Sequence, residues 1–246
     1  MTHFVCSVAL SLFTLVSLAL GGGFKEIVAF GDSLTDNGLH ISRDLQGFRA
    51  FSDGPVYPEY LAELLGIPIS LVANYAYSGA KSGLGNFYFK DWSGVIWQVE
   101  EYLKIVGNVP PTTLVIYQAA GTNDILSGES PFNVVLPNIK LTLELLAKAG
   151  VKEMLFLNLF PADKMPYFNL VNETKRIGAE KLYKAANLEV NNSIIVPFSK
   201  KHPDINIYQV DTYKIWSRLE NIFENTTHAF THHRNETKQN DSLKYV

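Results

Sequence analysis

Short apolar runs alternate with longer amphipathic stretches along most of this chain. The runs are bounded by Gly, Pro, Asn or Asp and have the length and composition that are typical of buried strands. They cover residues 26–30, 68–73, 113–117, 153–157 and 205–210. The pattern therefore predicts five short strands.

Between these runs, apolar residues recur at helical spacing. They predict helices over residues 58–65, 97–106, 139–147, 173–200 and 213–219. Strands that alternate with helices indicate a parallel sheet with helices on both faces, an α/β fold. Because right-handed crossovers bring the carboxyl ends of the strands to one edge, we expect a site at that edge.

The first predicted strand is followed by Gly31-Asp32-Ser33-Leu34-Thr35-Asp36. Gly31 permits a tight exit from the strand. We expect Ser33 to stand at the start of a helix, where its hydroxyl is exposed and developing negative charge is favoured. The alternative is that Ser33 only caps that helix, with Asp36 as the partner three residues on.

Two further motifs follow the second and third predicted strands. Gly79 comes after the second strand and can present its backbone N–H without a side chain in the way, unless Ser78-Gly79 is a simple turn. Asn123, in Gly121-Thr122-Asn123-Asp124, comes after the third and can donate a side-chain hydrogen bond, unless it or Asp124 caps a helix. Together the three motifs supply a nucleophile and two donors for an oxyanion, which is what acyl transfer requires.

In these motifs the sequence resembles the GDSL/SGNH serine hydrolases from about Lys25 to about Ala229. The resemblance implies a three-layer α/β/α fold of flavodoxin-like type, in agreement with the five predicted strands. It also implies that Ser33 is the catalytic nucleophile and that Gly79 and Asn123 form the oxyanion hole. It implies no metal and no organic cofactor.

Two other stretches resemble the secreted fungal lipases and acetylesterases of this family. They are residues 51–60 and 92–99. That likeness implies a small-molecule or polysaccharide ester as substrate, with a short acyl or acetyl group, on plant-wall sugars for example. Four aromatic residues either line a carbohydrate cleft or pack in the core: Tyr57, Tyr75, Tyr77 and Trp92.

The general base of the resembled family lies in an Asp-x-x-His block, and this sequence contains no Asp-x-x-His. His228 is the nearest substitute by chain position, since Glu224 stands four residues before it. The alternative is a truncated, catalytically impaired product that only binds a ligand or has no activity. His232 and His233 extend a histidine cluster, but they lack the partner spacing of a metal site. Residues 230–246 are polar and predict a disordered tail.

The first twenty residues predict a cleaved signal peptide, because an apolar run ends at the small residues Ser17 and Ala19. A transmembrane anchor is the alternative, but no basic flank follows. The expected organisation is a signal peptide over 1–20, a hydrolase domain over 21–229 and a tail over 230–246. Secretion makes five sequons candidate glycosylation sites: Asn172, Asn191, Asn225, Asn235 and Asn240.

Composition narrows the remaining function classes. The net charge of −3 offers no basic surface for nucleic acid. A flavodoxin-like nucleotide binder needs a Gly-rich phosphate loop after the first strand, where Asp32 stands instead. The expected protein is a secreted, monomeric ester hydrolase without a stable membrane partner.

Overall fold

The computed structural model describes residues 23–38, 52, 54–165, 168 and 170–219. The predictions that concern residues 1–20, His228, His232, His233 and the tail lie outside these described residues. Five parallel strands form one sheet in the order β2-β1-β3-β4-β5. They are β1 (Glu26–Phe30), β2 (Val72–Asn74), β3 (Thr113–Gln118), β4 (Glu153–Leu157) and β5 (Asn206–Val210).

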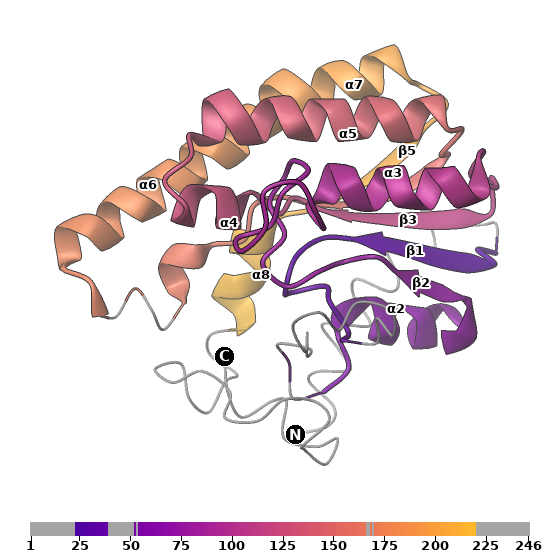
Figure 1. The fold of residues 1–246 in the computed structure, drawn as a ribbon, viewed down its shortest axis with the longest axis horizontal. Helices are drawn as coiled ribbons and strands as arrows, with labels where there is room; N and C mark the ends of the chain where they lie inside the picture. Colours follow the sequence, from indigo (N-terminus) through magenta and orange to yellow (C-terminus); the bar gives the residue numbers. More distant parts are fainter. Residues whose placement is uncertain (1–22, 39–51, 53, 166–167, 169, 220–246) are drawn as a thin grey trace.

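Helices cover both faces of this sheet, which makes the predicted three-layer α/β fold (Figure 1). The chain forms α2 (Tyr57–Leu65), α3 (Val95–Val106), α4 (Gly121–Leu126), α5 (Leu136–Lys148), α6 (Glu173–Glu189), α7 (Val196–Lys201) and α8 (Thr212–Leu219). The smaller core joins α2 to side chains such as Ile27 and Ile116. The larger core joins α3, α5 and the 190–198 region to the opposite face of β1, β3 and β4.

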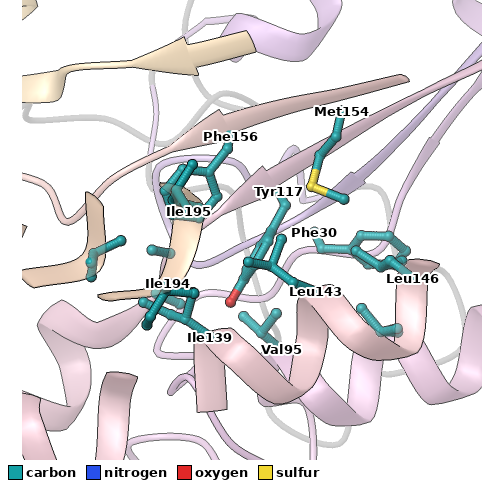
Figure 2. Close-up of a cluster of buried hydrophobic side chains, with 14 of the residues drawn as sticks. Phe30, Val95, Tyr117, Ile139, Leu143, Leu146, Met154, Phe156, Ile194 and Ile195 are labelled. Carbon is teal, nitrogen blue, oxygen red and sulfur yellow. The ribbon is translucent and has the colours of Figure 1, made fainter. Parts of the chain in front are cut away.

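The larger core follows from the two-residue period of the strands. Phe30, Tyr117 and Phe156 point from successive strands of the sheet toward α3 and α5 (Figure 2). Leu143 and Leu146 on α5 are fully buried against them. β3 is buried along its whole length, so the centre of the sheet is a rigid support for the loops at its carboxyl edge.

The sequence prediction is wrong at the start of the second strand. Residues Ile69–Leu71 form a 3₁₀ turn, closed by the bond from Leu71 N–H to Pro68 O at 2.8 Å, and only Val72–Asn74 pair with β1. An apolar run cannot reveal this local bond.

The predicted helix over 173–200 contains a π-helical stretch, Val190–Ile195, before α7. Pro197 lies just beyond that stretch. A proline has no N–H for the carbonyl four residues earlier and its ring crowds that carbonyl, so the helix widens. The same arrangement precedes α5, where π-helical Pro131–Val135 is followed by Pro137.

No helix in the described part of the chain has both the length and the apolar composition needed to cross a bilayer. Among the same residues, no group of three or more His, Cys, Asp or Glu side chains is arranged to hold a metal ion.

Candidate active site

The three sequence motifs lie at one edge of the sheet. β1 pairs with both β2 and β3. The segments that follow these three strands are therefore neighbours, although they are far apart in the sequence. Tyr77 N–H, after β2, donates to Gly31 O after β1 at 3.2 Å. Asn123, after β3, reaches Ala80 O at 2.8 Å. The structure thus brings the segments of Ser33, Gly79 and Asn123 together.

Ser33 lies in a turn, so the expectation that it starts a helix is wrong for residues 31–38. Thr35 N–H and Asp36 N–H both donate to Asp32 O, at 3.0 and 2.9 Å. The Asp32 carboxylate accepts Leu34 N–H at 3.0 Å, which is the role that a capping side chain would have. The capping alternative for Ser33 fails for the same reason.

Two buried glutamines hold this turn from behind. Gln98 on α3 accepts Gly31 N–H at 3.0 Å and donates to Gly31 O at 2.9 Å, so it pairs with both polar groups of that residue. Gln118 at the end of β3 accepts Asp32 N–H at 2.9 Å and the Thr35 hydroxyl at 2.8 Å. It also donates to the Asp32 carboxylate at 2.9 Å. These contacts fix the backbone around Ser33.

Among residues 31–36, only the backbone N–H of Ser33 has no acceptor in the described part of the chain. The other five N–H groups donate to Gln98, Gln118 or Asp32. Buried backbone N–H groups are nearly always paired, so an unpaired one beside a half-buried serine is available to a ligand.

Gly79, in the neighbouring segment, also has a backbone N–H without an acceptor among the described residues. Across residues 78–82, the other four N–H groups donate to Asp36, Tyr77, Gly85 and Asp124, and only Gly79 N–H has no acceptor among the described residues. Gly79 has a φ of 81°, and a Cβ there would lie 2.8 Å from Asn86 Oδ1. This backbone requires glycine, so the turn alternative accounts for the residue but not for its unpaired N–H.

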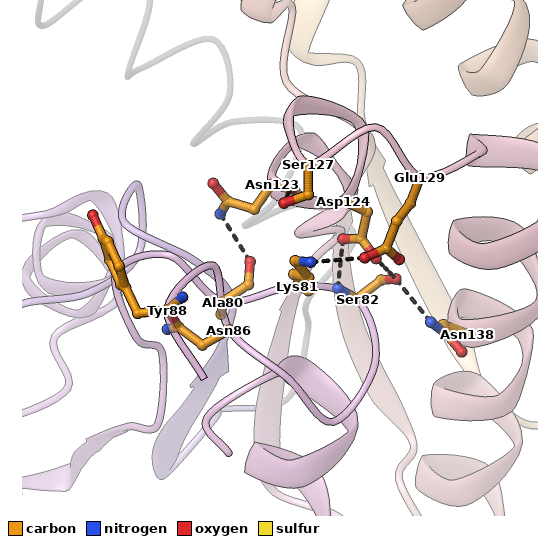
Figure 3. Close-up of polar contacts among 10 residues, drawn as sticks. All are labelled: Ala80, Lys81, Ser82, Asn86, Tyr88, Asn123, Asp124, Ser127, Glu129 and Asn138. Carbon is orange, nitrogen blue, oxygen red and sulfur yellow. Dashed lines mark hydrogen bonds and ion pairs between the residues drawn. The ribbon is translucent and has the colours of Figure 1, made fainter. Parts of the chain in front are cut away.

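Asn123 lies inside α4 and does not cap it, because the residue before that helix is Ala120. Its side-chain nitrogen donates one hydrogen to Ala80 O at 2.8 Å (Figure 3). An amide nitrogen carries two hydrogens, so a second remains for a ligand. Asp124 does not cap α4 either: its carboxylate accepts the backbone and hydroxyl hydrogens of Ser82.

Two buried carboxyls belong to this network. Burial raises the pKa of Asp32 to about 6, against the opposing effect of hydrogen bonds from Leu34 and Gln118. Burial also raises the pKa of Asp124 to about 6, against the effect of Ser82. Asp32 Oδ1 accepts both Leu34 N–H and the Gln118 amide, and the two oxygens of Asp124 each accept a hydrogen from Ser82, so both acids hold the loops of the site.

The aromatic residues that were candidates for a carbohydrate cleft mostly pack against other side chains. Tyr77 is fully buried and packs edge-on against Trp92, with ring centroids 5.1 Å apart. Tyr75 packs against Phe30 and Tyr102. Tyr57 donates to or accepts from the Thr35 hydroxyl at 3.0 Å and so supports the Ser33 turn.

Two of the glycosylation candidates lie in the described residues. Asn172 is exposed and its side-chain oxygen accepts Lys175 N–H at the start of α6. Asn191 is half-buried in the π-helical stretch, and its amide donates to Asn192. Asn225, Asn235 and Asn240 lie outside the described residues.

Sequence reasoning missed the contacts that hold the three loops in place, which are made by Asp36, Ser78, Ser82, Asn86, Gln98 and Gln118. One signal existed for Gln98, since it lies in the stretch 92–99 that resembles secreted family members. The others contact partners 42 to 86 residues away, except Asn86, which reaches back eight residues to Ser78 O.

The sheet order and the polar groups at its carboxyl edge define a flavodoxin-like α/β protein with a candidate site where strand order reverses, between β1 and β3. The sequence matches the model of the GDSL-like lipase/acylhydrolase family over residues 27–242, and the chain belongs to that family. The matched region extends past Ala229, where the likeness of the motifs ends. Membership of this family points to an ester-hydrolysing enzyme.

A solved structure agrees with the fold. A member of the lipolytic G-D-S-L family from Veillonella parvula has a TM-score of 0.51 at 17% identity, covering 84% of this chain and 90% of that one. The YXIM protein of Bacillus subtilis has a TM-score of 0.45 at 17% identity, covering 79% of this chain and 45% of that one. No curated protein is significantly similar to the chain in sequence.

Proposed function

We propose that this protein hydrolyses carboxylic esters through an acyl-enzyme on Ser33. One observation carries the proposal: Ser33 N–H and Gly79 N–H have no acceptor in the described chain, while the neighbouring N–H groups in both loops are paired. Two such donors beside a serine hydroxyl and the Asn123 amide are the groups that acyl transfer needs.

In the proposed reaction, Ser33 Oγ forms a bond to the ester carbonyl carbon and passes its proton to a base. Ser33 N–H, Gly79 N–H and the Asn123 amide stabilise the oxyanion of the tetrahedral intermediate. The alcohol leaves with a proton, and water then releases the acid and regenerates Ser33. We propose His228 as the first candidate for the base; it lies outside the described residues.

We extend the proposal to a short acyl or acetyl ester on carbohydrate, acted on outside the cell by a monomer. The residues that resemble secreted fungal esterases support this substrate. Phe87 and Tyr88 add support, since both are largely exposed and Phe87 N–H donates to Gly79 O at 2.8 Å. Exposed rings on the loop whose backbone bonds to Gly79 suit the apolar face of a sugar.

The test is p-nitrophenyl acetate hydrolysis by the purified chain and by Ser33→Ala and Asn123→Ala. Ser33→Ala should remove turnover above background. Asn123→Ala should lower kcat by about 10²- to 10³-fold, because one oxyanion donor is lost. Ser70→Ala and Asn133→Ala are controls at exposed positions and should retain wild-type rates.

The second candidate function is an inactive chain of the same fold that binds an ester or sugar without turning it over. The absence of Asp-x-x-His from the sequence favours it. Equal background rates for the wild type and Ser33→Ala would reject the esterase proposal. Calorimetric binding of an acetylated oligosaccharide by such a chain would then support the second candidate.

A further inference from the structure

Buried acid–serine pairs hold the segment Ser78–Ser82 at both ends. At one end, Ser78 donates its N–H and its hydroxyl to Asp36 Oδ2, at 2.7 and 2.8 Å. At the other end, Ser82 donates its N–H and its hydroxyl to the Asp124 carboxylate, at 2.8 and 2.7 Å. All four residues are at most 1% exposed.

The two acids come from different segments of the site, the loop after β1 and the helix α4. Asp36 follows Ser33 after β1, and its second oxygen accepts Gly38 N–H at 2.8 Å. Asp124 follows Asn123 on α4. The segment Ser78–Ser82 therefore connects the serine loop to the helix that carries the amide donor. Hydrogen bonds to a carboxylate are about twice as strong as neutral ones, so these are firm attachments.

The proposed oxyanion donors depend on the same segment. Gly79 N–H belongs to it, and Asn123 donates its first amide hydrogen to Ala80 O within it (Figure 3). Asn138 donates to the Ser82 hydroxyl at 3.0 Å. The Lys81–Glu129 ion pair at 2.7 Å is partly exposed, so it contributes little to holding the segment. A shift of Ser82 relative to Asp124 would move Gly79 and Asn123 apart.

We propose that Asp36 and Asp124 are positioning residues, which fix Ser78–Ser82 from both sides and so set the distance between the Gly79 N–H and the Asn123 amide. The inference rests on the proposed ester hydrolysis for its role in catalysis. Both donors must lie about 3 Å from a single oxygen atom, and a displacement of about 1 Å can cost on the order of 100-fold in rate.

The first test compares Asp124→Ala with Asp124→Asn and Glu129→Gln in ester hydrolysis. Asp124→Ala should lower kcat by about 100-fold with little change in KM, because the donors act on the transition state. Asp124→Asn keeps an oxygen for Ser82 N–H and should recover most of that loss. Glu129→Gln removes only the neighbouring, partly exposed ion pair and should match the wild type. A kcat for Asp124→Ala equal to that of Glu129→Gln would overturn the proposal.

A second measurement is independent of activity. Amide hydrogen exchange over residues 78–82 should become at least about tenfold faster in Asp124→Ala than in Glu129→Gln, while β3 stays protected in both. β3 thereby reports that the variant is folded. If Asp124→Ala fails to fold, Ser82→Ala, which removes one bond of the pair, should show a smaller change of the same kind.

The two measurements separate this inference from the proposed function. If the wild type shows no turnover that depends on Ser33, the esterase proposal fails, and exchange alone decides whether Asp124 holds the segment. Unchanged exchange over residues 78–82 in a folded Asp124→Ala variant would overturn the positioning role even in an active enzyme.

Discussion

Gly79 combines two constraints at one residue. Its φ of 81° lies in the left-handed region, and any Cβ there would approach Asn86 Oδ1 at 2.8 Å. Asn86 cannot give way easily, because its amide also donates to Ser78 O and the Ser93 hydroxyl. The residue type is thus set by backbone geometry and by a packed neighbour together.

We predict that Gly79→Ala lowers the free energy of unfolding by about 2 to 3 kcal/mol, from left-handed strain plus the contact with Asn86. Gly66→Ala is the matched control. Gly66 has a φ of 69° with nothing within 4 Å of its Cβ position, so only the strain of about 1 kcal/mol should apply. Urea denaturation of both variants measures the difference. Equal losses would mean that the contact with Asn86 carries no energy.

At the scale of single residues, the sequence pointed to polar residues directly after strands but not to their hydrogen-bond partners. Ser33, Gly79 and Asn123 were predicted as site residues because each follows an apolar run within a few residues. Gln118 could not be found, because its contacts with Asp32 and Thr35 span 86 and 83 residues and depend on β3 lying beside β1. A polar residue at the end of a strand gives no signal for a role of that kind.

The elements themselves were largely predictable because their apolar patterns are local. Four strands and the helices α2, α3, α5 and α8 agree with the prediction within a few residues. The errors occur where a hydrogen bond competes with the pattern: the 3₁₀ turn Ile69–Leu71 before β2, and the turn at Ser33 held by Asp32 and Gln118. The spacing of apolar residues gives no information about either set of hydrogen bonds.

The link between β3 and the Ser33 turn is testable at Gln118, which is 2% exposed. Gln118→Ala leaves Asp32 N–H unpaired, removes one of the two hydrogen bonds of the Thr35 hydroxyl and opens a small cavity. We expect a loss of about 3 kcal/mol in the free energy of unfolding.

Gln209→Ala is the matched control for this change, since Gln209 lies exposed on β5 and should change the stability by less than about 0.5 kcal/mol. Urea denaturation checks both variants. Similar values for the two would show that the turn does not depend on β3.

Across the whole molecule, the two buried carboxyls link stability to pH. The pKa values of Asp32 and Asp124 rise from 3.8 to about 6 on folding, chiefly through burial. Between these values the native state keeps protons that the unfolded chain has released. The contribution of these two groups to the free energy of unfolding therefore falls as the pH rises through this range and is constant above about pH 7. The exposed carboxyls with lowered pKa values, Glu144, Glu173, Glu180 and Asp204, have the opposite dependence: their contribution is lost as the pH falls below the ordinary pKa of 4.5 or 3.8, and solvent keeps it small.

We predict that the full chain is more stable at pH 5 than at pH 7, with about 2 to 3 kcal/mol from the two carboxyls together. Asp124→Asn should reduce this difference by about half, since an amide does not titrate. Asp204→Asn, at an exposed position, should leave it unchanged. Urea denaturation at both pH values gives the three differences. Greater stability at pH 7 for the wild type would mean that Asp32 and Asp124 stay ionised at low cost, because the hydrogen bonds from Leu34, Gln118 and Ser82 then outweigh the loss of hydration.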